Sequence, residues 1–125
     1  MWKKHNENPI NNRVGDCVIR AISTALCQEW SKTYADLCVQ GLMFFDLPSS
    51  NAVWGSYLAH KGYKRYVIPN KCNCYTVEDF CKEHPEGTYI LGTGTHAVTV
   101  ISGNFYDVWD SSQETPIYYF AKEEE

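Results

Sequence analysis

The sequence has no long apolar run, no basic stretch and no linker rich in proline and glycine that would separate domains. A helix that crosses a bilayer needs about 20 consecutive apolar residues, and no segment of the chain approaches that length. Asparagine and proline follow the first basic residues, where a secretory signal would have an apolar core. We therefore expect a cytoplasmic protein without a membrane partner.

Basic residues are too few and too scattered for a nucleic-acid interface. Lys and Arg number 11 against 15 acidic residues, and the formal net charge is -4. Proteins that bind nucleic acid through its phosphates carry a basic patch or stripe. We expect no nucleic-acid partner.

The length and the order of patterns predict one α+β domain over residues 1–125. Apolar residues recur at helical spacing in the first half, and β-branched and aromatic runs separated by turn residues fill the second half. We expect N-terminal helices, including the helix that carries Cys17, to pack on a C-terminal antiparallel sheet, with residues 1–10 and 121–125 as a mobile lead-in and tail. The helices are expected at 17–30, 31–41, 49–62 and 76–80, and the strands at 66–69, 89–91, 96–101, 105–109 and 117–120.

The six cysteines are numerous for this length, and their even number would suit a disulfide framework. However, the chain shows no export signal, and Cys27 and Cys38 fall on predicted apolar helix faces, where a free cysteine behaves as a small hydrophobic residue. We expect the thiols to be reduced.

Cys17 lies where the first predicted helix begins. Gly15-Asp16 precedes it, and Asp16 can cap the helix. The unpaired amides and the dipole of a helix N-terminus stabilise a thiolate, and the same amides can bind an oxyanion. Cys17 is therefore the candidate nucleophile.

His96 is the candidate base. It follows Gly92-Thr93-Gly94-Thr95 and begins an apolar strand, so its ring can face a cleft while the sheet holds its backbone. A thiol nucleophile needs such a base within hydrogen-bonding reach.

The base in turn needs a group that orients its ring. If 102–104 form a three-residue hairpin loop, Asp110 lies across from His96 on the next strand, whereas a two-residue turn at 103–104 places Ser111 there. We expect Asp110 to orient the ring, with Asp107 as the fallback.

The segments GDCVIRAI near the start, and GTGTHAVTVI and FYDVWDSS near the end, resemble the papain-like cysteine peptidases, particularly compact bacterial and phage members similar to bacteriocin-processing peptidases. In that superfamily a Cys at a helix N-terminus, a His on a strand and an Asp or Asn on the next strand form a catalytic triad, which matches Cys17, His96 and Asp110. The resemblance implies a papain-like fold and a cysteine peptidase or related thiol acyl hydrolase. Such an enzyme acts on a peptide or protein through a covalent thioester and needs no cofactor.

The resemblance also implies an oxyanion donor before the nucleophile. The family has a Gln six residues before the Cys, and Asn11 stands at that position, with a side chain that can donate the same N–H bond. Acyl transfer in place of hydrolysis would use the same site residues.

A second cluster leaves another interpretation open. Cys72, Cys74, Cys81 and His84 have the donor types of a tetrahedral zinc site, although C-x-C is tighter than the usual C-x2-C. We expect no metal here, and a redox pair of Cys72 and Cys74 is a further alternative. The alternative function is a catalytically inactive papain-like binding module, with structural zinc at this cluster.

Overall fold

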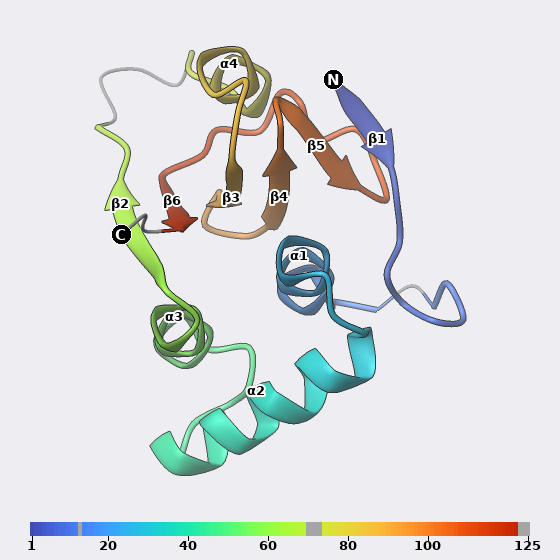
Figure 1. The fold of residues 1–125 in the computed structure, drawn as a ribbon, viewed down its shortest axis with the longest axis vertical. Coiled ribbons are helices and arrows are strands. Elements are labelled where there is room, and N and C mark those ends of the chain that lie inside the picture. Colours follow the sequence, from blue (N-terminus) through green and yellow to red (C-terminus); the bar gives the residue numbers. More distant parts are fainter. Residues whose placement is uncertain (13, 70–73, 123–125) are drawn as a thin grey trace.

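The computed structural model describes residues 1–12, 14–69 and 74–122. Within these residues, four helices and six strands form a mixed structure, which confirms the expected α+β class (Figure 1). The helices are α1 (Cys17–Leu26), α2 (Trp30–Phe44), α3 (Asn51–His60) and α4 (Val77–Glu83). The strands are β1 (Trp2–Lys4), β2 (Tyr63–Val67), β3 (Thr88–Gly92), β4 (Ala97–Ile101), β5 (Asn104–Asp107) and β6 (Tyr118–Lys122).

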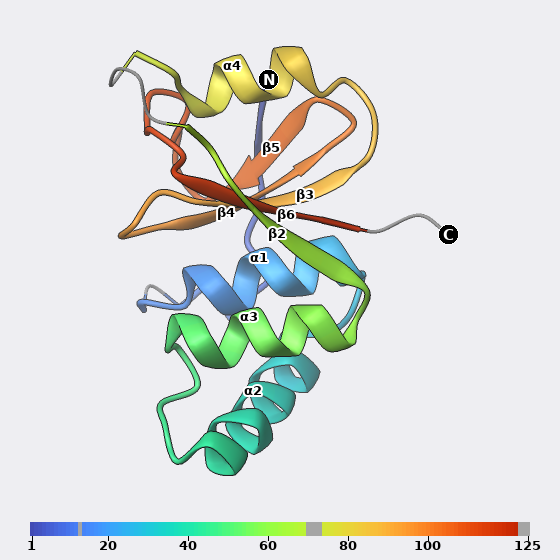
Figure 2. The same ribbon diagram turned by 90° about the vertical axis from the view of Figure 1, so that its left-hand side faces the viewer.

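The described strands form one sheet in the order β1-β5-β4-β3-β6-β2. Neighbouring strands are antiparallel, except for the parallel edge pair of β1 and β5. Figure 2 shows the sheet between α4 on one side and α1 with α3 on the other, and α2 lies beyond those two helices. The sheet is thus not purely C-terminal, because β1 comes from the N-terminal end and β2 from the middle of the chain.

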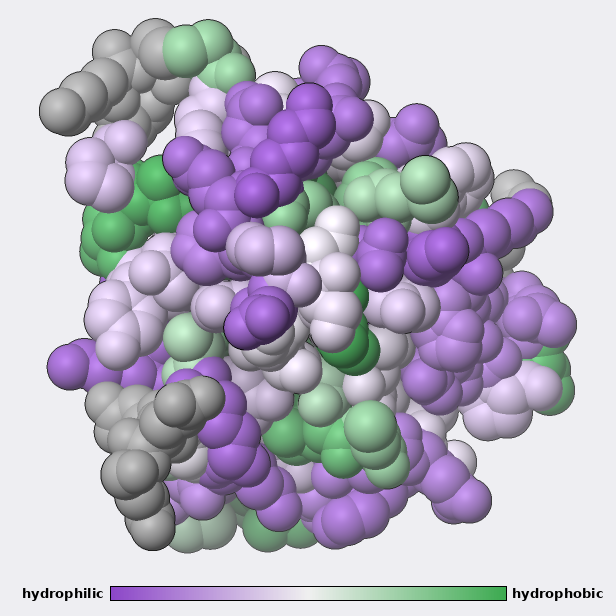
Figure 3. All heavy atoms as spheres, turned by 45° about the horizontal axis from the view of Figure 1, so that its top comes forward, coloured by the Kyte–Doolittle hydropathy of each residue, from purple (hydrophilic) through white to green (hydrophobic). Residues whose placement is uncertain are grey.

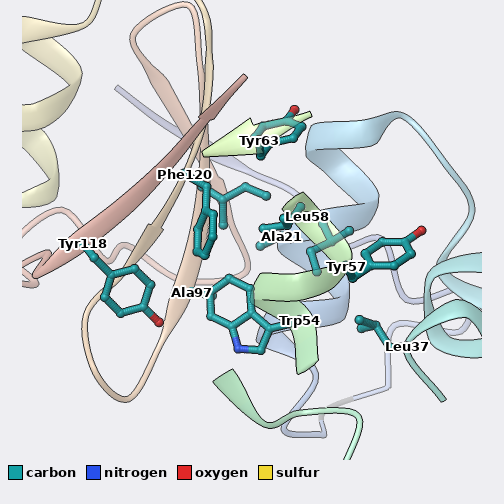
Figure 4. Close-up of a cluster of buried hydrophobic side chains, with 11 residues drawn as sticks. Ala21, Leu37, Trp54, Tyr57, Leu58, Tyr63, Ala97, Tyr118 and Phe120 are labelled. Atoms are coloured by element: carbon teal, nitrogen blue, oxygen red, sulfur yellow. The ribbon is translucent and has the colours of Figure 1, made fainter. Parts of the chain in front are cut away.

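One hydrophobic core joins α1 and α3 to the sheet. Figure 4 shows Trp54 of α3 beside Ala97 of β4 and Phe120 of β6, and the rings of Trp54 and Phe120 are 5.2 Å apart between centroids. Such aromatic contacts add about 0.5–1.5 kcal/mol to the burial of apolar area. This core holds α1 close to β4, and so fixes the distance between the residues at their ends.

A second core lies under α4. Val77, Phe80 and Cys81 pack against buried residues of β3, β4 and β5. The helix begins with a capping box in which the side chains of Thr76 and Asp79 each accept a hydrogen bond from the other's backbone N–H. This confirms the predicted capped helix before Pro85.

The hairpin between β4 and β5 differs from both turns considered in the sequence. Ser102 and Gly103 alone form the turn, with φ values of 51° and 78°. Positive φ at both central residues is typical of a type I′ turn, whose twist matches that of the flanking strands. As a result Thr99 faces Tyr106, and Asp107 lies nearer to the His96 end of β4 than either expected register allowed.

The chain ends also differ from expectation. Trp2 and Lys4 of β1 pair with Phe105 and Asp107 of β5, so residues 2–4 are part of the sheet. Residues 121 and 122 belong to β6, while 123–125 lie outside the described residues. The expectation of a lead-in and a tail outside the fold is wrong for these strand residues.

Helix α1 is shorter than predicted. It ends at Leu26, because Cys27 adopts the left-handed conformation and its N–H bonds back to the helix. Cys27 is exposed instead of lying on an apolar helix face, whereas Cys38 is half-buried on α2.

Cysteine oxidation differs from expectation at one described position. Cys17, Cys27, Cys38 and Cys81 are free thiols. Cys74 is disulfide-bonded, so the prediction of reduced cysteines is wrong for this residue.

The described part of the chain contains no helix with the length and hydrophobicity needed to cross a membrane. The face shown in Figure 3 is mainly hydrophilic, and its hydrophobic atoms gather in smaller separate areas. This face of the described residues is therefore dominated by polar side chains.

Candidate active site

The first residue of α1 is Cys17, as the sequence predicted. Its half-buried side chain packs on the core between α1 and the sheet. The first helical N–H that bonds to a carbonyl is that of Arg20, which donates to Asp16 over 2.9 Å. The amides of the three preceding residues make no such bond within the described residues, so they can face an anion at the helix tip.

His96 lies directly before β4, at the end of the turn from β3. The turn includes Gly94 with φ of 97°, and the Thr93 N–H donates to the His96 carbonyl over 2.9 Å. The Trp109 ring lies 5.1 Å from the His96 ring between centroids and covers it on one side. The backbone and the ring of His96 are therefore both held.

Asp107, the last residue of β5, is the partner of His96. The Nε2 atom of His96 is 2.5 Å from Oδ2 of Asp107, whose side chain is 1% exposed. The Ser111 hydroxyl donates to the same oxygen over 2.7 Å, and the Val108 N–H donates to Oδ1 over 2.8 Å. These bonds hold the Asp107 carboxylate against the His96 ring.

The His96 ring also lies close enough to Cys17 for the two groups to shift each other's pKa, and both residues line the same cleft. Because Nε2 is used by Asp107, Nδ1 is the nitrogen that remains for the sulfur. Burial raises the pKa of the Cys17 thiol, but the hydrogen bonds from His96 and the Ala97 N–H and the charge of His96 outweigh it, so the pKa lies below its usual value. The thiol is thereby favoured as a thiolate.

The pKa of His96 is raised to about 9, although burial alone would lower it, because Asp107 and Cys17 both stabilise the charged ring. The pKa of Asp107 lies below its usual value: burial would raise it, but the hydrogen bond and charge of His96 outweigh that effect. All three shifts therefore favour the charged forms: a thiolate next to an imidazolium, with a carboxylate behind it.

Asp110, the expected orienting residue, does not contact His96. It is exposed, and its Oδ1 accepts a hydrogen bond from the Ser112 N–H over 3.1 Å. The prediction failed because Ser102 and Gly103 form the turn. This turn shifts β5 along β4 relative to both expected registers. The fallback residue, Asp107, is the one that the structure brings to the ring.

Asn11 does not lie beside Cys17. It is exposed, and it lines a separate polar cavity together with Lys4, Asn12 and Arg20. Its N–H donates to the Asn8 carbonyl over 3.0 Å. The assignment of Asn11 as oxyanion donor is therefore not supported by its position, and the free amides at the start of α1 are the available donors.

The described members of the cluster considered as an alternative zinc site have other partners. Cys74 is disulfide-bonded and Cys81 is buried in the core under α4. The Nδ1 atom of His84 lies 2.9 Å from the Phe80 carbonyl, and its ring stacks on the Phe80 ring. Cys72 lies outside the described residues, and among those described no three His, Cys, Asp or Glu side chains form a metal-binding group.

Arg20 is a site residue that the sequence analysis missed. It lies one turn after Cys17 on α1, and its guanidinium donates to the carboxylates of both Asp16 and Asp107. The spacing of Asp16 and Arg20, four residues apart on a helix, was the available signal. The contact with Asp107 could not be predicted because it depends on how α1 packs on β5.

A cleft of about 380 Å³ opens beside the candidate nucleophile and base. Cys17 and His96 lie on its wall with the loop that contains Gly94 and Thr95. Its other walls are mainly apolar or aromatic and include Val18, Tyr34, Leu37, Pro48, Trp54 and Tyr118. The cleft thus offers apolar contact area next to the thiol.

A thiol at a helix tip, an imidazole and a buried carboxylate therefore lie in one row beside an open cleft. Comparisons of the chain with protein-family models, curated proteins and solved structures find no match.

Proposed function

We propose that the chain is a papain-like cysteine hydrolase that cleaves peptide or related acyl bonds. Cys17 is the nucleophile, His96 the acid and base, and Asp107 the residue that orients the ring. The observation that carries the proposal is the position of Cys17 at the start of α1 on the same cleft wall as His96, whose ring is bonded to the buried Asp107 carboxylate. A nucleophile, its base and an orienting acid in this order are what covalent acyl hydrolysis requires.

In the first half of the reaction the thiolate of Cys17 attacks the substrate carbonyl carbon and forms a tetrahedral intermediate. The amides at the start of α1 stabilise its oxyanion. His96 then donates the Nδ1 proton to the leaving nitrogen, the C–N bond breaks, and an amine departs. A thioester on Cys17 and a neutral His96 remain.

In the second half a water molecule attacks the thioester carbonyl, and His96 accepts its proton. The C–S bond then breaks, which releases a carboxylic acid product and restores the thiolate next to the charged imidazole. Throughout both steps Asp107 keeps the ring in the same orientation. The cycle consumes one water and needs no metal or redox partner.

The cleft walls favour a substrate with an apolar side chain near the scissile bond. Leu37, Trp54 and Tyr118 offer apolar contact area on the side of the cleft formed by α2, α3 and β6. Burial of apolar area contributes about 25 cal/mol per Å² before the costs of association. We therefore propose peptides with an aliphatic or aromatic residue next to the cleaved bond.

Incubation with a diverse peptide library, with products identified by mass spectrometry, tests the proposed activity. The wild-type chain should produce defined fragments, and the Cys17→Ala and His96→Ala variants should not. Fragments that persist with Cys17→Ala, or a wild-type chain that leaves every peptide and thioester substrate intact, would contradict the proposal.

A further inference from the structure

Arg20 connects the helix that carries the thiol with the carboxylate that holds the base. Its Nε donates to Oδ1 of Asp16 over 2.8 Å, and its Nη1 donates to Oδ1 of Asp107 over 3.2 Å. The Arg20 side chain is 13% exposed, against 4% for Asp16 and 1% for Asp107. These ion pairs are therefore shielded from solvent, unlike most surface pairs.

Each of the two carboxylates is held by a different part of the molecule. Oδ2 of Asp16 accepts hydrogen bonds from Trp30 Nε1 on α2 over 3.0 Å and from Asn8 Nδ2 over 3.3 Å. Oδ2 of Asp107 takes the contact with His96, which leaves Oδ1 for Arg20. Arg20 of α1 thus connects Asp107 with Asp16, which is itself bonded to Trp30 of α2.

We propose that Arg20 is a positioning residue that sets the Asp107 carboxylate, and through it the His96 ring, relative to Cys17. This inference rests on the proposed function. Rigid contacts between α1 and β5 are otherwise sparse, because the sheet meets α1 mainly through β4. A guanidinium suits the role, since its planar fork can hold two carboxylates at fixed angles, whereas an ammonium acts as a point charge.

Arg20 also adds positive charge near the thiol. The charged groups around Cys17 are Asp16 directly before α1, Arg20 from α1, His96 from the turn before β4 and Asp107 from β5. The Tyr118 hydroxyl of β6 also lies within electrostatic range. Removal of Arg20 leaves the two carboxylates uncompensated, so it should disfavour the thiolate. The effect of the Arg20 charge can therefore be separated from the effect of its forked geometry by a variant that keeps the charge and changes the geometry.

The test measures two quantities on the full chain: alkylation of Cys17 by iodoacetamide against pH, followed by peptide mapping, and kcat on a peptide that the wild type cleaves. Arg20→Gln removes the charge and should move the alkylation midpoint up by about half a pH unit or more. Arg20→Lys keeps the charge, so its midpoint should stay near that of wild type, while kcat falls about tenfold because the fork is lost.

Lys32→Gln is the matched control, because Lys32 and Asp36 form an ion pair of the same spacing on α2, away from the thiol. It should leave both quantities unchanged. Circular dichroism selects conditions in which each variant is folded. If Arg20→Gln does not fold, Arg20→Lys and Asp16→Asn decide the matter: both should lower kcat without raising the midpoint.

A purely structural role for Arg20 predicts a different result. The folded variants would then keep the wild-type midpoint and kcat, and only their unfolding would change, which would overturn the inference. If the wild-type chain shows a low midpoint but cleaves no substrate, the hydrolase proposal fails, while the midpoint of Arg20→Gln still tests the link between Arg20 and the thiol.

Discussion

At the scale of single residues, we expect the bond between His96 and Asp107 to set the upper pH limit of the proposed hydrolysis. In the proposed reaction protonated His96 is the acid that releases the leaving amine, and its pKa of about 9 means that the proton is kept through neutral pH. As pH rises through this value the acid is lost. As pH falls through the lowered pKa of Cys17, the thiolate is lost.

Hydrolysis should therefore follow a bell-shaped curve in kcat/KM, with its alkaline limb near pH 9. Asp107→Asn removes the negative charge that raises the pKa of His96, so the alkaline limb should move to lower pH. Initial rates between pH 5 and pH 10, in ~0.15 M salt to limit long-range effects, measure the shift. An alkaline limb that stays in place would show that Asp107 does not stabilise the charged ring.

The two neighbouring aspartates provide a paired test at one pH. Asp107→Asn should lower kcat by about a hundredfold, because the ring loses its orienting acceptor. Asp110→Asn should have little effect, because its carboxylate is exposed and bonds only locally. Equal losses of kcat in both variants, or a larger loss in Asp110→Asn, would contradict the assignment of Asp107 as the residue that orients the His96 ring.

Residue types and local position were enough to predict Cys17 and His96. A helix start and a strand start can be recognised from neighbours in sequence: Cys17 begins α1 as predicted, and His96 lies one residue before β4. Which aspartate orients the His96 ring depends on the turn after β4, and Ser102 and Gly103 form a turn that differs from both turns considered. The contact of Arg20 with Asp107 depends on how α1 packs on β5. Neither of these is visible in local sequence pattern.

At the scale of elements, the β4 to β5 hairpin controls which aspartate reaches the base. Its turn requires positive φ at Ser102 and Gly103, and a Cβ at Gly103 would lie 3.4 Å from the Cys81 carbonyl and from Pro85 Cα.

Most helices and strands were predicted near their observed places because their apolar periodicity is local. The edge strand β1 was missed because three residues that pair with β5 carry no periodic signal.

Gly103→Ala should destabilise the fold by about 1–2 kcal/mol, since a Cβ disfavours the left-handed conformation. Urea unfolding followed by circular dichroism measures the loss. Gly15→Ala is the control, because its Cβ would meet no atom within 4 Å and its φ is not positive. Equal stability of the two variants would contradict the turn assignment.

At the scale of the whole molecule, the site is also part of what holds the helices to the sheet. The pKa of Asp16 is below its ordinary value: burial would raise it, but hydrogen bonds from Arg20, Asn8 and Trp30 together outweigh burial and lower it. Asp107 is shifted in the same direction. Both therefore contribute stability above the ordinary carboxyl pKa, and this contribution is lost as pH falls through their lowered folded values.

The free energy of unfolding should accordingly decrease from pH 7 to pH 3. Asp16→Asn should lower it at pH 7 by roughly 1–3 kcal/mol, through the loss of charged hydrogen bonds, and should make the further decrease in acid smaller. Urea titrations at several pH values measure both effects, with Asp110→Asn as the exposed control. A variant curve parallel to that of wild type would contradict a role for Asp16 in acid stability.

The central claim is that His96 holds Cys17 as a thiolate, and pH-resolved alkylation with peptide mapping tests it most directly. In the wild-type chain Cys17 should react fastest of the free thiols at neutral pH, with a midpoint below that of an ordinary cysteine, and His96→Ala should raise this midpoint. Labelling of Cys17 no faster than that of exposed Cys27, with a midpoint unchanged by His96→Ala, would contradict the account.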